Sequence, residues 1–394
     1  MKSNILKPNS QIPIQIDLAE SIAGDKVILA LGAELKANYC ILNKQKAYLY
    51  SGFADLKNPK FYDNYKQSIL SEIKRLRIKP QIIARDLNLM FLSSRLAEEL
   101  HDSRFKQSQV MAIQHHFAHV AGACAALGIK KQKVIGIACD GTGLGSDQKV
   151  WGCEFISYDF KQAIRLGHLG YFALPGGDKA VAEPWRVAVA LLYMVYGQEL
   201  LDLPMAWIKQ KKYEIHLLIQ MIEKKINSPL ASSSGRLFDA VSALTGLCLN
   251  VNSEAEAAIA LEIEASKVIS LEHKAYGFAI NKQDNMFIVD IREMIKDIVL
   301  DIQAKQPSAN IAARFHNTFV LILGKMAVKI RQELKTNQIV LGGGVFFNKI
   351  ILEKLNNYLV KQGFHAHSPG PEFLSDAGLA LGQALLAARI SANK

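Results

Sequence analysis

Three histidines crowd the segment HHFAH, and the spacing of two of them suits metal binding. His115 and His119 are four residues apart, so on a helix they share one face and both imidazoles can reach a single cation. His116 points elsewhere on such a helix. The competing interpretation is a histidine pair satisfied by backbone groups and water. A metal site would also need ligands from other parts of the chain.

Two aspartates occupy positions from which they can complete such a site. Asp140 closes the apolar strand VIGIACD, where a side chain points into a cleft, and Asp376 opens the last helix in SDAG. Taken alone, Asp376 is explained as a helix N-cap or a first-turn charge. Two neutral imidazoles with one or two carboxylates suit Fe(II), Zn(II) or Mn(II), and they leave coordination positions open for a substrate oxygen.

Glycine-rich turns follow three of the apolar strands. They are LALGAEL at 29–35, ACDGTGLG at 138–145, which includes Gly141 and Gly143, and VLGGGVFFN at 340–348. Glycine lets backbone amides approach a ligand closely, and a helix N-terminus beyond the turn favours phosphate. None of the turns has P-loop or dinucleotide-fold spacing. Any one of them could be a simple tight turn, but together they indicate a nucleotide held between two lobes.

The elements that must position these residues alternate between strands and helices. Residues 1–25 have no clear periodicity and are interpreted as an N-terminal tail. Residues 26–155 alternate strands, a hairpin and helices and form the predicted N-terminal α/β lobe. Residues 156–394 contain long helical stretches, a late strand and a last helix that returns to the cleft. The sequence predicts an α/β architecture of doubled halves.

Composition limits the class of protein further. The chain has 394 residues, half of them hydrophobic, and a formal net charge of +11, which is typical of a globular protein with a substantial core. The basic residues are scattered and lack interleaved aromatic residues, so nucleic-acid binding is unsupported. Five cysteines without a CxxC pair are expected to be reduced. No apolar run approaches membrane-helix length, so no membrane association and a cytoplasmic location are expected.

Seven motifs along the chain carry a resemblance to a known family. They are HHFAH, DGTGLGSDQKVWGCEF, RLGHLGYFALPGGDKAVAEPWRVA, GRLFDAVSALTG, ARFHNT, VLGGGVFFNKIILEKL and SDAGLALGQA. In order and spacing, from about residue 27 to 390, the chain resembles the C-terminal carbamoyltransferase domain of the hydrogenase-maturation protein HypF. That domain is similar to the threonylcarbamoyl-transfer enzyme TsaD and to the actin-like ATPase superfamily (ASKHA). The resemblance implies a two-lobed fold with a central nucleotide and metal cleft.

The resemblance also implies roles for individual residues. The metal ligands would be His115, His119, Asp140 and Asp376. The nucleotide would contact Gly141, Gly143, Gly235, Asp239, Gly342, Gly343, Gly344 and Asn348. Lys36 and Arg186 match segments at the acyl-phosphate end and are the predicted catalytic residues. The family's DLHP stretch is DLNL here, from Asp86 to Leu89, and a paired glycine after the tryptophan is Gly152 with Cys153. These departures affect the predicted acceptor surface.

The resemblance implies a metal-dependent carbamoyltransferase that binds an adenine nucleotide (ATP, AMP or carbamoyl adenylate). The donor would be carbamoyl adenylate from a separate YrdC-like protein, and the acceptor the C-terminal cysteine of a HypE-like partner in cyanide-ligand synthesis for nickel-iron hydrogenase. One alternative is carbamoyl or threonylcarbamoyl transfer to a small molecule or tRNA. Another is a non-catalytic nucleotide-binding regulator, and a sugar-kinase-like ATPase is a further one.

Overall fold

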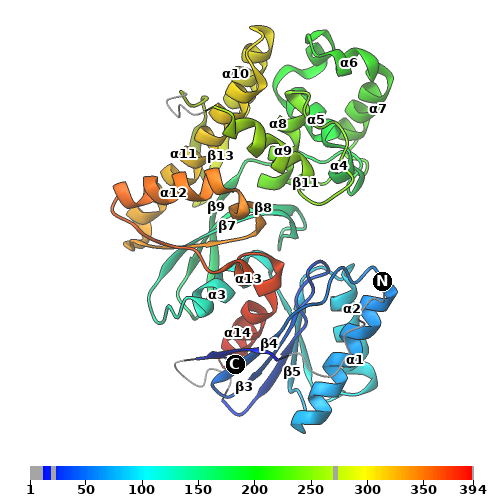
Figure 1. Cartoon of the computed structure of the whole chain (residues 1–394), viewed down its shortest axis with the longest axis vertical. Coiled ribbons are helices and arrows are strands. Elements are labelled where there is room, and N and C mark those ends of the chain that lie inside the picture. Colours follow the sequence, from blue (N-terminus) through cyan, green and yellow to red (C-terminus); the bar gives the residue numbers. More distant parts are fainter. Residues whose placement is uncertain (1–11, 19–23, 269–273, 393–394) are drawn as a thin grey trace, which may run out of the picture.

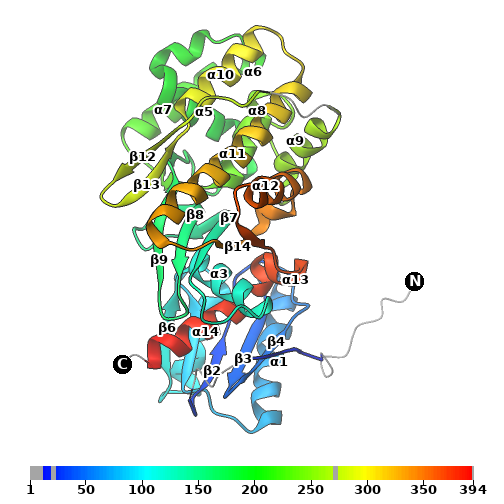
Figure 2. The ribbon, with the colours of Figure 1, turned by 90° about the vertical axis from the view of Figure 1, so that its left-hand side faces the viewer.

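The computed structural model describes residues 12–18, 24–268 and 274–392. Two lobes are stacked along its long axis, and each is built around one β-sheet (Figures 1 and 2). The N-terminal lobe contains β1 (Ile14–Asp17), β2 (Val27–Ala30), β3 (Tyr39–Asn43), β4 (Lys46–Tyr50), α1 (Pro59–Leu76), β5 (Ile82–Asp86), α2 (Leu92–Ser103) and β6 (Gln109–Ile113). Two helices, α3 (His115–Ala126) and α14 (Leu379–Ala392), lie between the lobes (Figure 2).

The C-terminal lobe is the larger of the two. Its strands are β7 (Val134–Leu144), β8 (Val150–Tyr158), β9 (Ala163–Leu169), β10 (Phe172–Ala173), β11 (Leu230–Ala231), β12 (Ala279–Gln283), β13 (Met286–Asp290), β14 (Gln338–Gly342) and β15 (His365–His367). Its helices are α4 (Lys179–Ala182), α5 (Pro184–Tyr196), α6 (Ala206–Gln210), α7 (Lys212–Glu223), α8 (Ser234–Leu244), α9 (Glu256–Ser266), α10 (Arg292–Gln303), α11 (Ser308–Leu334), α12 (Lys349–Lys361) and α13 (Pro371–Leu374). Short 3₁₀ helices are η1 (Gly197–Asp202), η2 (Gly344–Phe347) and η3 (Asp376–Gly378).

The two sheets repeat one arrangement of strands. In the first sheet, β4, β3 and β2 are antiparallel, and β5 and β6 are added parallel to β2. In the second sheet, β9, β8 and β7 are antiparallel, and β14 and β15 are added parallel to β7. Short hairpin connections suit the antiparallel strands, whereas each parallel addition needs a helical crossover. The predicted doubled halves are therefore present.

Helices α3 and α14 each pack on the sheet of the other half. Helix α3 follows the last strand of the first sheet but packs on β7, β8 and β14 of the second sheet. Helix α14 follows the last strand of the second sheet but packs on β2, β3 and β5 of the first. The two helices also pack against each other at glycine positions, because a Cβ atom at Gly122 would lie 2.9 Å from the carbonyl oxygen of Gly378. Each half thus contributes a helix to the core of the other.

Long apolar helices form the core of the C-terminal lobe. Helices α5, α8 and α11 pack with the second sheet into one buried cluster, which contains Phe238, Phe315 and Phe319 in edge-on or stacked ring contacts. Helix α11 is long and apolar enough to cross a membrane, but most of that segment is buried inside the protein. This burial is typical of the central helix of a core.

The structure differs from the sequence-based organisation in three places. The change of sheet comes after Ile113, so the predicted lobe boundary at residue 155 does not coincide with it, and β7 and β8 belong to the second sheet. Within the predicted tail, Ile14–Asp17 form β1, which pairs with β4; residues 1–11 and 19–23 lie outside the described residues. The serine-rich segment 229–239, whose composition is typical of a polar loop, instead enters α8, where Ser233 caps the helix by accepting from the Arg236 N–H.

The contact between α3 and α14 gives a prediction about stability. A Cβ atom at Gly382 would overlap the carbonyl oxygen of Ala118, which is backbone and cannot rotate away. We expect Gly382→Ala to lower the free energy of unfolding by about 1–3 kcal/mol. At a helix position without this contact, a change from glycine to alanine would instead raise the free energy of unfolding by about 1 kcal/mol. Chemical denaturation therefore tests the contact by the sign of the change in stability.

The matched control is Ile390→Ala on the same helix, whose side chain is 40% exposed. We expect it to change stability by less than about 0.5 kcal/mol. A Gly382→Ala protein as stable as the parent would contradict the close packing of the two helices.

Candidate metal and nucleotide site

Four side chains from distant parts of the chain converge between the lobes. His115, His119, Asp140 and Asp376 each offer one ligand atom, and these four atoms lie within 4.8 Å of one another. The Nε2 atom of His119 is 3.2 Å from Asp140 Oδ2 and 3.4 Å from Asp376 Oδ1. The Nε2 atom of His115 is 3.4 Å and 3.5 Å from the same two oxygens. The structure therefore brings the four predicted ligands together.

Helix α3 places both histidines on one face. Gln114 caps the helix by accepting from the Phe117 N–H, so the helix begins at His115. The following residues AHVAGACAA are mostly small and buried, which lets α3 lie against both the second sheet and α14. Both imidazoles are buried, and their ring centroids are 4.9 Å apart. The i, i+4 spacing thus has the geometry that the sequence predicted.

The two aspartates reach the same point from β7 and from the segment that precedes α14. Asp140 lies in β7 where the pairing with β8 becomes irregular, between Cys139 and Gly143. Its Oδ1 accepts from the Gly141 N–H at 2.8 Å, which leaves Oδ2 directed at the histidines. Asp376 begins η3, immediately before α14. A strand bulge and a helix start thus orient the two carboxylates.

Asp86 is a fifth member of the site that the sequence analysis did not assign. It ends β5, is fully buried, and its Oδ2 lies 2.8 Å from His115 Nδ1. Its Oδ1 accepts from the Asn88 N–H at 2.8 Å. A carboxylate on the far nitrogen of a ligating histidine fixes the ring and its tautomer, so that Nε2 presents a lone pair. The signal in the sequence was an aspartate at the end of a predicted strand, but its partner is 29 residues away.

The charges of the cluster are balanced internally. Burial alone would lower the pKa of His115, but the charge of Asp86 and hydrogen bonds to Asp140 and Asp376 raise it well above its ordinary value. Burial would raise the pKa of Asp140, but its hydrogen bonds to the two histidines hold it well below the usual range. A cation at this place would therefore compete with protons for the two imidazoles.

The donor set fits a divalent transition metal. Two imidazole nitrogens and two carboxylate oxygens are the ligands that Fe(II), Zn(II) and Mn(II) accept, and the Asp86 contact supplies the supporting hydrogen bond expected around such a site. His116 is not in the ligand group, in agreement with its position on the helix. Its ring is buried beside His115, and within the described parts of the chain its Nε2 has no hydrogen-bond partner.

Glycines from three elements surround the cluster. Gly343 has a φ of 99°, and a Cβ atom there would overlap the backbone of Cys139. A Cβ atom at Gly344 would lie 3.4 Å from Asp140 Oδ1, and one at Gly342 would lie 3.2 Å from the Cβ atom of His119. The late triple glycine therefore runs directly beside two of the candidate ligands, as a phosphate-binding turn would require.

A further glycine contact brings α8 to the same place. A Cβ atom at Gly235 would lie 2.7 Å from the Cα atom of Gly141. Ser233 donates to the Gly141 carbonyl at 2.5 Å, so the start of α8 is hydrogen-bonded to the irregular part of β7 that follows Asp140. Gly143 lies on the other side of that part, where a Cβ atom would be 2.6 Å from His116 Cε1.

Two of the predicted nucleotide residues have structural partners. The guanidinium group of Arg236 donates to Asp239 at 2.6 Å, and Asp239 is buried. Asn348 caps α12 by accepting from the Ile351 N–H, and its Nδ2 lies 3.0 Å from His316 Nε2. Contact of either side chain with a nucleotide stays a prediction.

Lys36 and Arg186 lie with other partners. The Lys36 ammonium group forms an ion pair with Glu254 at 3.0 Å, across the two lobes, and both side chains are about half exposed. The Arg186 guanidinium group pairs with Glu183 and lies over the ring of Trp185. Neither contact involves the cluster, so a catalytic role for these two residues stays a prediction.

Comparisons with known proteins show which proteins the chain resembles. Residues 136–383 match the family model described as "Carbamoyltransferase, Kae1-like Domain, second subdomain", and residues 23–126 match "HypF Kae1-like domain". A "Carbamoyltransferase HypF homolog" of Cupriavidus necator is 34% identical over 366 residues, which cover 92% of this chain and 91% of that protein. The "Carbamoyltransferase HypF" of Synechocystis is 31% identical over 94% of this chain but only 48% of its own length.

A solved structure agrees over almost the whole chain. Full-length HypF in the phosphate- and nucleotide-bound form superimposes with a TM-score of 0.87 and 32% identity, covering 96% of this chain and 48% of that one. The chain thus spans about half the length of these longer relatives. The superposition agrees with the predicted two-lobed α/β fold.

The Asp86 contact predicts a loss of metal affinity without loss of the ligands. In Asp86→Asn, the side-chain amide can face either His115 Nδ1 or the Asn88 N–H with its oxygen, but not both, so one hydrogen bond is lost. We expect the affinity for Zn²⁺ to fall by about 10- to 100-fold, measured by competition with a chromophoric chelator. Asp55→Asn is the control, because Asp55 accepts from a backbone N–H two residues on but contacts no histidine of the cluster. Equal affinity in both variants would contradict the role of Asp86.

The buried contact between His316 and Asn348 predicts a pH dependence of stability. Burial lowers the pKa of His316 to about 4, below the value of about 6.5 in an unfolded chain. Stability from this group is complete above pH 6.5 and is lost as the pH falls towards 4, because only the unfolded state takes up the proton. We expect a contribution of roughly 3 kcal/mol.

The measurement is urea unfolding at several pH values for the parent and for His316→Gln. The variant should lose less stability between pH 6.5 and 4 than the parent. His365→Gln, at an exposed histidine, should follow the parent curve. Parallel curves for the parent and His316→Gln would contradict the burial of a neutral imidazole.

Proposed function

The chain belongs to the HypF carbamoyltransferase family, and on that premise we propose that it moves a carbamoyl group from carbamoyl adenylate to a thiol. The acceptor is the C-terminal cysteine of a HypE-like partner, and the product serves cyanide-ligand synthesis for nickel-iron hydrogenase. The observation that carries the proposal is the convergence of two imidazoles and two carboxylates within 4.8 Å. A separate YrdC-like protein supplies the adenylate, and the cytoplasm is the proposed location.

The cluster holds the cation on which the proposed reaction depends. His115, His119, Asp140 and Asp376 would be its ligands, and Asp86 would keep His115 in the correct tautomer. A divalent cation at this place supplies positive charge to an oxygen of the substrate and orients its carbonyl group. The negative charge of the two carboxylates would favour a cation in the cluster and would repel the anionic nucleotide if no cation were bound.

The glycine turns bind and orient the adenylate. We place its phosphate along Gly342–Gly344, since a turn without side chains lies beside Asp140 and His119. The start of α8 closes the other side through Gly235 and Ser233. Holding donor and acceptor in one geometry converts a bimolecular reaction into an effectively intramolecular one, which is a large part of the available rate enhancement. The relative crystallised in a phosphate- and nucleotide-bound form supports the binding of a nucleotide in this fold.

The nucleophile comes from the acceptor and not from this chain. Cys139 and Cys153 lie next to the site in sequence, but both are fully buried, with their sulfur atoms 3.9 Å apart. The hydrogen bond with Cys139, together with burial, raises the pKa of Cys153 well above its ordinary value. A thiol in that state is a poor nucleophile. In the proposed step, the partner's thiolate attacks the carbonyl carbon and forms the new C–S bond. The bond between that carbon and the bridging phosphate oxygen breaks, and AMP leaves with the electron pair.

The proposal predicts a loss of AMP release when a ligand is removed. We expect His119→Ala to release AMP from carbamoyl adenylate roughly 100-fold or more slowly than the parent, because charge stabilisation of several kcal/mol is lost. The assay includes Zn²⁺ or Fe²⁺ and a peptide that ends in cysteine. His216→Ala, at an exposed histidine on α7, is the control and should keep the parent rate. Parent-like turnover by His119→Ala would contradict the proposed site.

The acceptor is tested in the same assay. AMP release should require the terminal cysteine and should stop with an otherwise identical peptide that ends in serine. AMP release that is indifferent to the cysteine peptide but depends on a hydroxyl or amine compound, or on tRNA, would contradict the thiol acceptor while leaving the metal site intact.

A further inference from the structure

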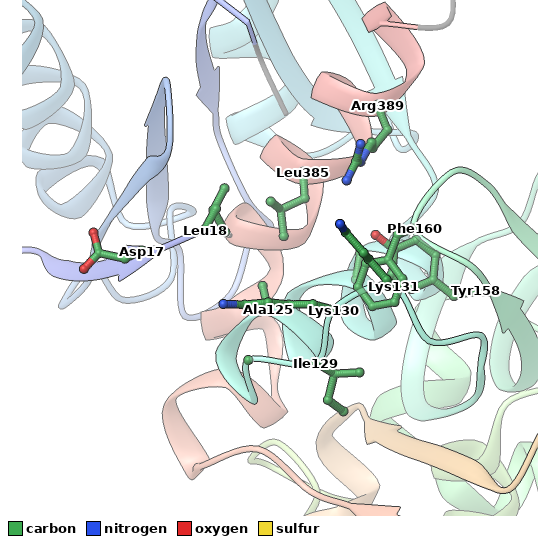
Figure 3. Close-up of a pocket in the computed structure, with 12 residues that line it drawn as sticks. Asp17, Leu18, Ala125, Ile129, Lys130, Lys131, Tyr158, Phe160, Leu385 and Arg389 are labelled. Carbon is green, nitrogen blue, oxygen red and sulfur yellow. The ribbon is translucent and has the colours of Figure 1, made fainter. Parts of the chain in front are cut away.

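A second pocket lies away from the cluster, at the opposite ends of the same two helices. Its walls come from the last turns of α3 and α14, from the end of β8 and from the residue that follows β1 (Figure 3). Ala125 and Ile129 lie at the end of α3, and Leu385 lies in the second half of α14. His115 begins α3 and Asp376 precedes α14, so each helix joins the two places.

The floor and one wall of the pocket are apolar. Leu18 and Leu385 form the floor, and the rings of Tyr158 and Phe160 stand at one side with centroids 4.9 Å apart (Figure 3). The cavity has a volume of about 70 Å³. A cavity of about 150 Å³ is enough to hold benzene. The enclosed part therefore accommodates a chain of a few carbon atoms, and a larger group must extend through the opening.

The rim is positively charged on the side of the aromatic rings. Arg389 from α14 and Lys131 from the loop after α3 direct their charged ends towards the same part of the pocket (Figure 3). The Arg389 guanidinium group makes no hydrogen bond or ion pair within the described residues. The carboxylate in the lining, Asp17, lies at the opposite edge, where Lys130 is also found (Figure 3). The charge around the apolar floor is therefore unevenly distributed, with Arg389 and Lys131 at one end and the oppositely charged Asp17 and Lys130 at the other.

We propose that this pocket binds a small amphipathic anion, a short aliphatic chain that carries a carboxylate or a phosphate monoester. The chain fills the cavity above Leu18 and Leu385, and the anionic group pairs with Arg389. A guanidinium group offers parallel N–H donors to either kind of anion, so the two share one recognition chemistry. Binding here requires neither the metal cluster nor the proposed transferase activity.

The test is NMR of the full chain with labelled isoleucine, leucine and valine methyl groups. Butyrate and butyl phosphate are the probes, and butanol and butylamine have the same chain without a negative charge. We expect saturable shifts of the Leu18 and Leu385 methyl signals with both anions, and binding at least about tenfold weaker for the uncharged and cationic compounds. Tighter binding of butyrate would identify the ligand as a carboxylate, and tighter binding of butyl phosphate would identify it as a phosphate monoester.

Variants at the rim separate a built site from general charge attraction. Arg389→Gln should weaken butyrate binding about tenfold or more, whereas Arg389→Lys should keep most of it. Lys329→Gln removes the same charge from an exposed position on α11, outside the pocket, and should bind as the parent does. The absence of saturable shifts at Leu385, equal binding of butanol, or equal weakening by Lys329→Gln would overturn the proposal. Unchanged methyl signals in the C-terminal lobe show that each variant is folded.

Discussion

Contact between α3 and α14 is the constraint on which the rest of the structure depends. Glycines on both helices allow backbone to touch backbone, at Gly122 with Gly378 and at Gly382 with Ala118. The histidines begin one helix, and Asp376 immediately precedes the other. Metal–ligand distances in proteins vary by only about 0.2 Å, so a separation of the helices by one methyl group would remove Asp376 from the coordination sphere. The close packing of α3 and α14 therefore also sets the distances between the candidate ligands.

Burial of so many charges is explained by function more readily than by stability. His115, His119 and Asp86 are almost completely inaccessible to solvent, and taking ions out of water costs several kcal/mol for each, which the attraction between opposite charges only offsets. The arrangement has a clear use if a cation replaces the protons. Around the cluster, Ser233 and Ser234 donate to backbone carbonyl oxygens and Asp86 contacts His115 Nδ1. Within the described residues, the buried Nδ1 of His119 has no hydrogen-bond partner. A site held in this way is rigid before any ligand arrives.

Sequence patterns predicted features that depend on residues a few positions apart. They missed contacts that depend on how strands distant in sequence pair with each other. The spacing of His115 and His119 gave their shared face, because helical periodicity acts over four residues. The strand end and the helix start made Asp140 and Asp376 candidates to complete the site, and the family resemblance matched both to metal ligands. Asp86 was placed at a strand end, but its contact with His115 depends on β5 and β6 pairing in parallel. Segment 229–239 appeared polar because its serines bind backbone carbonyls inside the core.

The exchange of helices between the halves has a consequence for biosynthesis. The ligands are spread over 376 − 115 = 261 positions, and the sheet of the first half lacks one covering helix until α14 has been made. A nascent chain that has completed its first sheet must keep that apolar surface from aggregating while the second lobe emerges from the ribosome. The four proposed ligands accordingly come together only after both halves have been made, and an interrupted or misdocked chain cannot bring all four to one point. Convergence of the four side chains therefore requires that synthesis and docking of both halves have been completed.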